Sequence, residues 1–138
     1  MSSTVEALKS FTDPQSGAHL KALDAAVQAV DPALCGPQEI QALLGVFERF
    51  PEQDGFGVFW GILHALEAIE GYEPELFDSV KRKPCEFNVL MVNRLLNAGV
   101  TEIGGNSLES LLHAVLANEL ATPQAQRDAL QYLERREQ

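Results

Sequence analysis

Apolar residues recur along the chain at the spacing of one helix face, and the strict alternation typical of strands is nearly absent. The clearest stripe consists of Leu20, Leu23, Val27 and Val30. Similar stripes run through residues 40–50 and 108–115, with polar residues on the opposite side. The pattern therefore predicts an all-α fold.

Turn-forming residues separate the stripes and set the expected helix boundaries. Three steps place a side-chain acceptor before a proline, as at helix starts: Asp13-Pro14, Asp31-Pro32 and Thr122-Pro123. Three glycines stand where stripes stop, as at left-handed helix ends: Gly36, Gly71 and Gly99. The punctuation predicts about eight helices, near 4–12, 17–30, 37–50, 56–70, 74–82, 85–98, 107–118 and 123–136.

Short connections pair the last six helices into antiparallel hairpins, namely 37–71, 73–99 and 106–138. These lengths are close to those of helical-repeat modules, although the three segments share little sequence. We expect a single domain over 1–138, either HEAT-like or a compact bundle. The apolar segments 56–70 and 85–98 are expected to form its spine and to be covered on most sides. Gly57 and Gly61 indicate that another helix crosses 56–70 closely.

Charge is unevenly distributed along the chain. Twenty acidic and ten basic residues give a net charge of −10, which argues against nucleic acid as a direct partner. Residues 48–78, which we call the acidic window, hold eight of the acids and only one base, Arg49. Such clustering is typical of solvated helix ends, or of a docking surface for a basic partner.

No stretch of the chain has the length and composition of a membrane-spanning helix. The longest run without a charged residue is the twelve from Gly55 to Leu66. The first residues lack the basic and apolar regions of a secretory signal. We therefore expect a cytoplasmic protein that does not bind membranes, with Cys35 and Cys85 as reduced thiols.

Candidate catalytic and metal-binding residues are scattered. His19, His64 and His113 are isolated, and the pair His64 and Glu67 is two ligands short of a zinc site. Cys85 follows three basic residues and is the more reactive thiol, unless it is a small core residue at a hairpin start. The segment 104–107 lacks the lysine of a phosphate loop and indicates a turn followed by a helix cap. We expect no catalytic, cofactor or metal site, and no enzyme.

Aromatic residues cluster between positions 47 and 60. Core packing explains most of them. The alternative is that one aromatic, Trp60 or the nearby Tyr72, is partly exposed as an interface anchor among the acids.

Two segments carry a resemblance to a family: ERFPEQDGFGVFWGILHALE at 48–67 and KRKPCEFNVLMVNRLLNAG at 81–99. Together they resemble the small helical immunity proteins of bacterial polymorphic toxin systems, several of which have HEAT-like folds. The resemblance implies that the chain binds the effector domain of a cognate secreted toxin inside the producing cell and blocks it. It supplies no residue-level binding motif.

The leading hypothesis is an immunity protein that docks an acidic surface on a basic toxin effector domain. The partner-binding residues predicted for it are Glu48, Glu52, Asp54, Trp60, Glu67, Glu70, Tyr72, Glu73, Glu75 and Asp78. The alternative is a generic helical adaptor that binds a cellular protein or peptide between its hairpins. An enzyme, the third possibility, requires a pocket that joins a histidine or cysteine to a ligand. The oligomeric state stays open.

Overall fold

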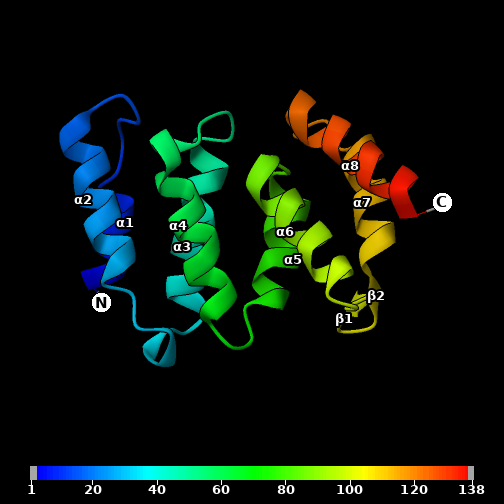
Figure 1. The fold of residues 1–138 in the computed structure, drawn as a ribbon, viewed down its shortest axis with the longest axis horizontal. Helices are drawn as coiled ribbons and strands as arrows, with labels where there is room; N and C mark the ends of the chain where they lie inside the picture. Colours follow the sequence, from blue (N-terminus) through cyan, green and yellow to red (C-terminus); the bar gives the residue numbers. More distant parts are fainter. Residues whose placement is uncertain (1–2, 137–138) are drawn as a thin grey trace. The chain divides into compact units, whose positions relative to one another are not determined.

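The computed structural model describes residues 3–136, which are helical apart from short connections and one two-stranded hairpin (Figure 1). Contacts between the elements group the chain into two compact units, residues 1–72 and 73–138, here called unit 1 and unit 2. The predicted all-α class is confirmed. The single domain over 1–138 stays a prediction.

Unit 1 is built from two helical hairpins. Its described elements are α1 (Ser3–Lys9), α2 (Gly17–Gln28), η1 (Pro32–Leu34), α3 (Pro37–Arg49), η2 (Gly55–Gly57) and α4 (Val58–Ala68), where η denotes a 3₁₀ turn. Helix α1 packs on α2 and α3, and α4 packs on the same two helices. The first helix of one hairpin thus lies on the first helix of the next, as in stacked helical repeats.

Aromatic rings join the helices of unit 1 at its centre. The Phe11 ring, just after α1, lies 5.1 Å from Phe50 and 6.3 Å from Phe59, both with edge-on geometry. Phe47 of α3 lies 5.8 Å from Phe59 of α4, measured between ring centroids. Phe47 and Phe59 are completely covered. Two of the five aromatics between positions 47 and 60, Phe47 and Phe59, are therefore core, whereas Phe50 is half-buried and Phe56 and Trp60 are exposed.

Unit 2 repeats this arrangement with the remaining helices. Its described elements are α5 (Glu73–Arg82), α6 (Glu86–Asn97), β1 (Glu102–Ile103), β2 (Asn106–Ser107), α7 (Leu108–Ala117) and α8 (Pro123–Arg136). Helix α5 packs on α6 and α7, and α8 packs on the same two helices. The three predicted hairpins are therefore present. The expected spine is divided, because 56–70 belongs to unit 1 and 85–98 to unit 2.

One polar side chain is enclosed in the core of unit 2. Asn88 of α6 is fully buried, and its Oδ1 accepts the Cys85 N–H at 2.8 Å. Its Nδ2 donates to the Ser79 hydroxyl at 3.1 Å and to the Lys83 carbonyl at 2.9 Å. The amide thus joins α5 to the first turn of α6 and satisfies backbone groups that water does not reach.

Most predicted helix boundaries are confirmed by their caps. Asp31 Oδ1 accepts the Ala33 N–H, and Thr122 Oγ1 accepts the Ala125 N–H. Asp13 makes only a local turn, and Ser16 caps α2 instead. Gly71 and Gly99 have the expected positive φ, but the prediction for Gly36 is wrong. Gly36 has φ −110° and is the N-cap residue of α3, because Pro37 fits the first helical position and Glu39 accepts the Gly36 N–H.

The sequence patterns miss the hairpin formed by β1 and β2. Glu102 pairs with Ser107 and Ile103 with Asn106, in antiparallel register. Gly104 and Gly105 form the connecting turn with φ of +57° and +83°, a conformation that favours glycine. Ser107 then caps α7 by accepting the Ser110 N–H, so the predicted turn and cap are present.

Candidate functional site

The acidic window crosses the boundary between the two units. Unit 1 contains five of its acids, Glu48, Glu52, Asp54, Glu67 and Glu70. Unit 2 contains the other three, Glu73, Glu75 and Asp78. Counted over whole units, unit 1 has ten acids and three bases, for a net charge of −7, whereas unit 2 has ten and seven. Most of the excess negative charge therefore belongs to unit 1.

The acids of the window differ in exposure. Glu52, Asp54, Glu70 and Asp78 are exposed, whereas Glu48, Glu67, Glu73 and Glu75 are half-buried. Glu73 and Glu75 lie in the first turn of α5, where negative side chains are stabilised by the helix dipole. The exposed acids remain the better candidates for contact with a partner.

Asp54 and Arg49 both have structural roles within the acidic window. Asp54 Oδ1 accepts the Phe56 N–H at 3.0 Å and so caps η2 at the start of the α4 segment. The Arg49 guanidinium donates to the Leu8 carbonyl at 2.9 Å and to the Phe11 carbonyl at 2.8 Å. The window's only base is thus held at the end of α1.

The two aromatics predicted as interface anchors differ in exposure. Trp60 has 43% of its surface exposed, whereas Tyr72 has only 6%. The expectation that Tyr72 is available to a partner is wrong, because its side chain is buried with the core. Phe56, which the helical spacing in the sequence does not distinguish from the core aromatics, has 76% of its surface exposed.

The backbone around Phe56 is unusual. Gly55, Phe56 and Gly57 have consecutive φ values of +60°, +52° and +92°. A phenylalanine in the left-handed region is strained, and this segment holds the ring in water. A Cβ at Gly55 would lie 2.7 Å from the covered Phe59 ring, so the chain approaches the core closely there. In the sequence, the only indication of this backbone conformation is a phenylalanine between two glycines.

Helix α4 is covered on most sides, as expected, and has one open face. Phe59, Ile62, Leu63 and Leu66 are completely buried. On the opposite side Trp60 and His64 are exposed, and their ring centroids lie 6.5 Å apart. A Cβ added at Gly61 would lie 3.6 Å from the Val27 side chain of α2, and α2 packs on α4, so the predicted helix crossing is present at Gly61. Gly57 has open space around it instead.

The residues that could carry chemistry are dispersed among the helices. His19 lies at the start of α2, and its Nδ1 accepts the Thr12 N–H at 3.3 Å. His64 and His113 are exposed on α4 and α7. Among residues 3–136, no group of three or more histidine, cysteine and acidic side chains has the geometry to hold a metal ion.

The two cysteines have different environments. Cys85 is buried at the start of α6, as a small core residue would be. Cys35 is half-buried, and its thiol donates to the Asp31 carbonyl. Burial, then the charges of Glu39 and Asp31, raise the pKa of the Cys35 thiol above its ordinary value.

We expect iodoacetamide at pH 8 to alkylate Cys35 slowly and to leave Cys85 unmodified in the folded chain. A raised pKa lowers the thiolate fraction at a given pH, and the thiolate is the reacting form. Mass spectrometry over a pH series should give a rate midpoint for Cys35 above that of a short unstructured peptide thiol. Modification of Cys85 before Cys35 would contradict the structure.

Across residues 3–136, no helix combines the length and the apolar character needed to cross a membrane. Comparison with known protein families finds no match, and comparisons with curated proteins and with solved structures find none either.

Proposed function

We propose that the chain is a non-enzymatic immunity protein that binds a basic toxin effector domain in the cytoplasm of the producing cell. The family resemblance of residues 48–67 and 81–99 suggests this class of protein. The observation that carries the proposal is the exposure of Phe56 and Trp60 on unit 1, whose net charge is −7.

Exposed aromatic side chains beside acids suit recognition of a basic protein. Aromatic anchors supply much of the binding energy of protein interfaces, and surrounding charges steer the encounter. Phe56 is held outward at a cost in backbone strain, which a binding role explains and a packing role does not. Asp54 lies two residues before Phe56, and the exposed Glu52 and Glu70 belong to the same unit.

The proposal is tested first by complex formation. The toxin effector domain encoded beside this chain is purified, mixed with it and examined by size-exclusion chromatography. We expect a stable complex in which the toxin is inactive. Failure to form a complex would contradict the proposal. If the chain instead forms a complex with an acidic or neutral protein, the result would favour the alternative hypothesis of a generic helical adaptor.

The anchors are tested by truncation. We expect Phe56→Ala and Trp60→Ala each to weaken toxin binding by roughly tenfold or more, mainly through faster dissociation. Alanine retains a Cβ at position 56, so the backbone strain is largely unchanged. Leu34→Ala is the matched control, because Leu34 is an exposed apolar residue of the same unit on η1. Equal effects of all three substitutions would contradict a specific aromatic interface.

The acids are tested by charge reversal and salt. We expect Glu52→Lys combined with Glu70→Lys to slow association and to reduce its dependence on ionic strength. Glu119→Lys combined with Glu134→Lys makes the same change in net charge on exposed residues of unit 2. Surface plasmon resonance from low to high salt gives both rates. A control pair that slows association more than the Glu52 and Glu70 pair would place the interface elsewhere.

A further inference from the structure

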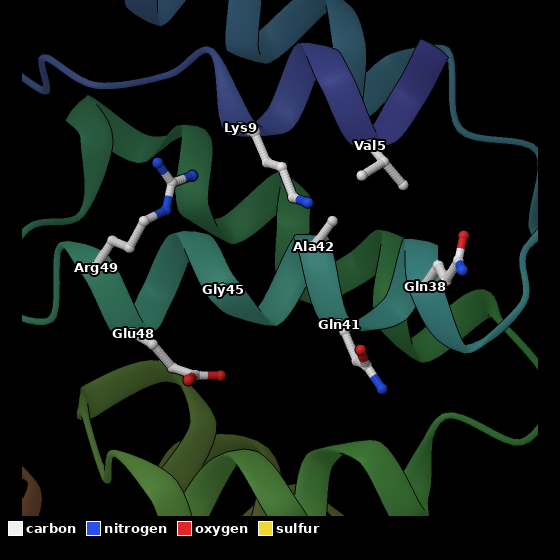
Figure 2. A pocket seen from close by; sticks show the side chains of 8 residues that line it. All are labelled: Val5, Lys9, Gln38, Gln41, Ala42, Gly45, Glu48 and Arg49. Atoms are coloured by element: carbon white, nitrogen blue, oxygen red, sulfur yellow. The ribbon is translucent and has the colours of Figure 1, made fainter. Parts of the chain in front are cut away.

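A cavity of about 690 Å³ opens between α1 and α3 of unit 1 (Figure 2). Its volume is within the range of small-molecule sites. The cavity is separate from Phe56 and Trp60, neither of which lines it. Glu48 is the only acid of the acidic window that lines it.

Two basic side chains line this cavity. Lys9 and Arg49 line it, and they are two of only three basic residues in unit 1. Figure 2 shows the Lys9 side chain extending from α1 over α3 toward Ala42, and the Arg49 guanidinium beyond Gly45, toward the C-terminal end of α3. Because Arg49 is fixed by the Leu8 and Phe11 carbonyls, its guanidinium is already positioned. Two of its five N–H donors make these bonds, and the others can serve an oxyanion.

The floor of the cavity is apolar and contains a glycine that internal packing does not require. Gly45 lies in the interior of α3, where glycine is less favourable than alanine for helix formation. A Cβ there would meet nothing within 4 Å. Ala42, one helical turn earlier, and Val5 of α1 extend the same apolar surface. The missing side chain at position 45 keeps the floor open.

The remaining polar groups make the two sides of the cavity different in charge. Gln38 brings an amide group that can donate or accept. Glu48 lines the other side, and in Figure 2 its carboxylate points away from Lys9. A negative group would be repelled by Glu48 and attracted to Lys9 and Arg49. Burial also lowers the pKa of Arg49, so a counter-charge beside it would offset part of the cost of desolvation.

We infer that this cavity binds a small organic anion, with its oxyanion head at Lys9 and Arg49 and a short apolar portion over Ala42 and Gly45. Arginine and lysine both bind carboxylates and phosphates, so the head group is one of these two. The ligand is held by charge at one end and by apolar burial along α3.

The test uses hexanoate and hexyl phosphate, each titrated into the ¹⁵N-labelled chain, with hexanol as the uncharged comparison. We expect saturable amide shifts that are largest in α1 and α3, with at least one of the two anions and not with hexanol. Tighter binding of one anion identifies the head group as carboxylate or phosphate. Shifts that are absent, or spread evenly over the chain, would overturn the inference.

Three substitutions locate the site. Lys9→Gln should weaken binding about tenfold, the size expected for one charged hydrogen bond, whereas Lys21→Gln, which removes the third base of unit 1, should not. Gly45→Leu should abolish binding by filling the floor, and circular dichroism shows whether it folds. Glu48→Gln should leave binding unchanged or strengthen it. Equal losses for Lys9→Gln and Lys21→Gln, or full binding by Gly45→Leu, would overturn the inference.

Discussion

Asn88→Ala is expected to lower the free energy of unfolding by about 3 kcal/mol, the largest effect of any polar substitution proposed for this chain. The truncation leaves the Cys85 N–H and the Lys83 carbonyl without the partners that the amide provides. Both groups lie at the junction of α5 and α6, and alanine cannot replace either hydrogen bond. A cavity left by the lost amide adds to the cost.

Urea denaturation followed by circular dichroism measures this loss. With a typical urea slope of about 2 kcal/mol per molar, the midpoint should fall by roughly 1.5 M. Asn97→Ala is the matched control, because Asn97 is an exposed asparagine at the end of the same helix. Its midpoint should move little. A similar small shift for Asn88→Ala would mean that the buried hydrogen bonds contribute little to stability.

Gly55→Ala is expected to destabilise unit 1, by roughly 3 kcal/mol. Two costs combine, because position 55 has φ +60° and the new Cβ would lie 2.7 Å from the Phe59 ring. The left-handed conformation alone costs an alanine about 1–2 kcal/mol. The covered Phe59 ring must also move, which strains the aromatic core of the unit.

Gly57→Ala separates these two costs. Position 57 has φ +92°, but a Cβ there would meet nothing within 4 Å, so only the conformational cost applies. Thermal unfolding followed by Trp60 fluorescence reports on unit 1, because Trp60 is the only tryptophan of the chain. Gly55→Ala should lower the melting temperature clearly more than Gly57→Ala. Equal shifts in melting temperature would show that the close approach to Phe59 does not contribute to the loss of stability.

The helices could be predicted because their periodic faces and their caps are local properties. The stripe that includes Leu23 and Val27 became the buried face of α2, and Thr122 before a proline became the cap of α8. The prediction for Gly36 is wrong because glycine is compatible with both ends of a helix. The proline after it, Pro37, favours the start of α3 over the end of the preceding segment. The hairpin at Gly104 and Gly105 was missed because two-residue strands have no periodicity to detect.

The candidate site could be predicted only in part. The acids of the window are visible in the sequence, but the boundary after Tyr72 that divides them depends on contacts between distant helices. The outward Phe56 results from three consecutive positive φ values, and helical spacing rules describe no such backbone. Sequence patterns therefore located the charge and the exposed Trp60, but not the outward Phe56.

The hydrogen bonds of Arg49 affect when helix α1 is stabilised during synthesis of the chain. Helix α1 has seven residues, and isolated helices shorter than about 12 residues are marginal in water. The carbonyls of Leu8 and Phe11 receive Arg49 from 41 and 38 residues further along the chain. While α3 is still inside the ribosome, the end of α1 therefore lacks its guanidinium partner. Helix α1, which leaves the ribosome first, therefore gains these two hydrogen bonds only after α3 has also left it.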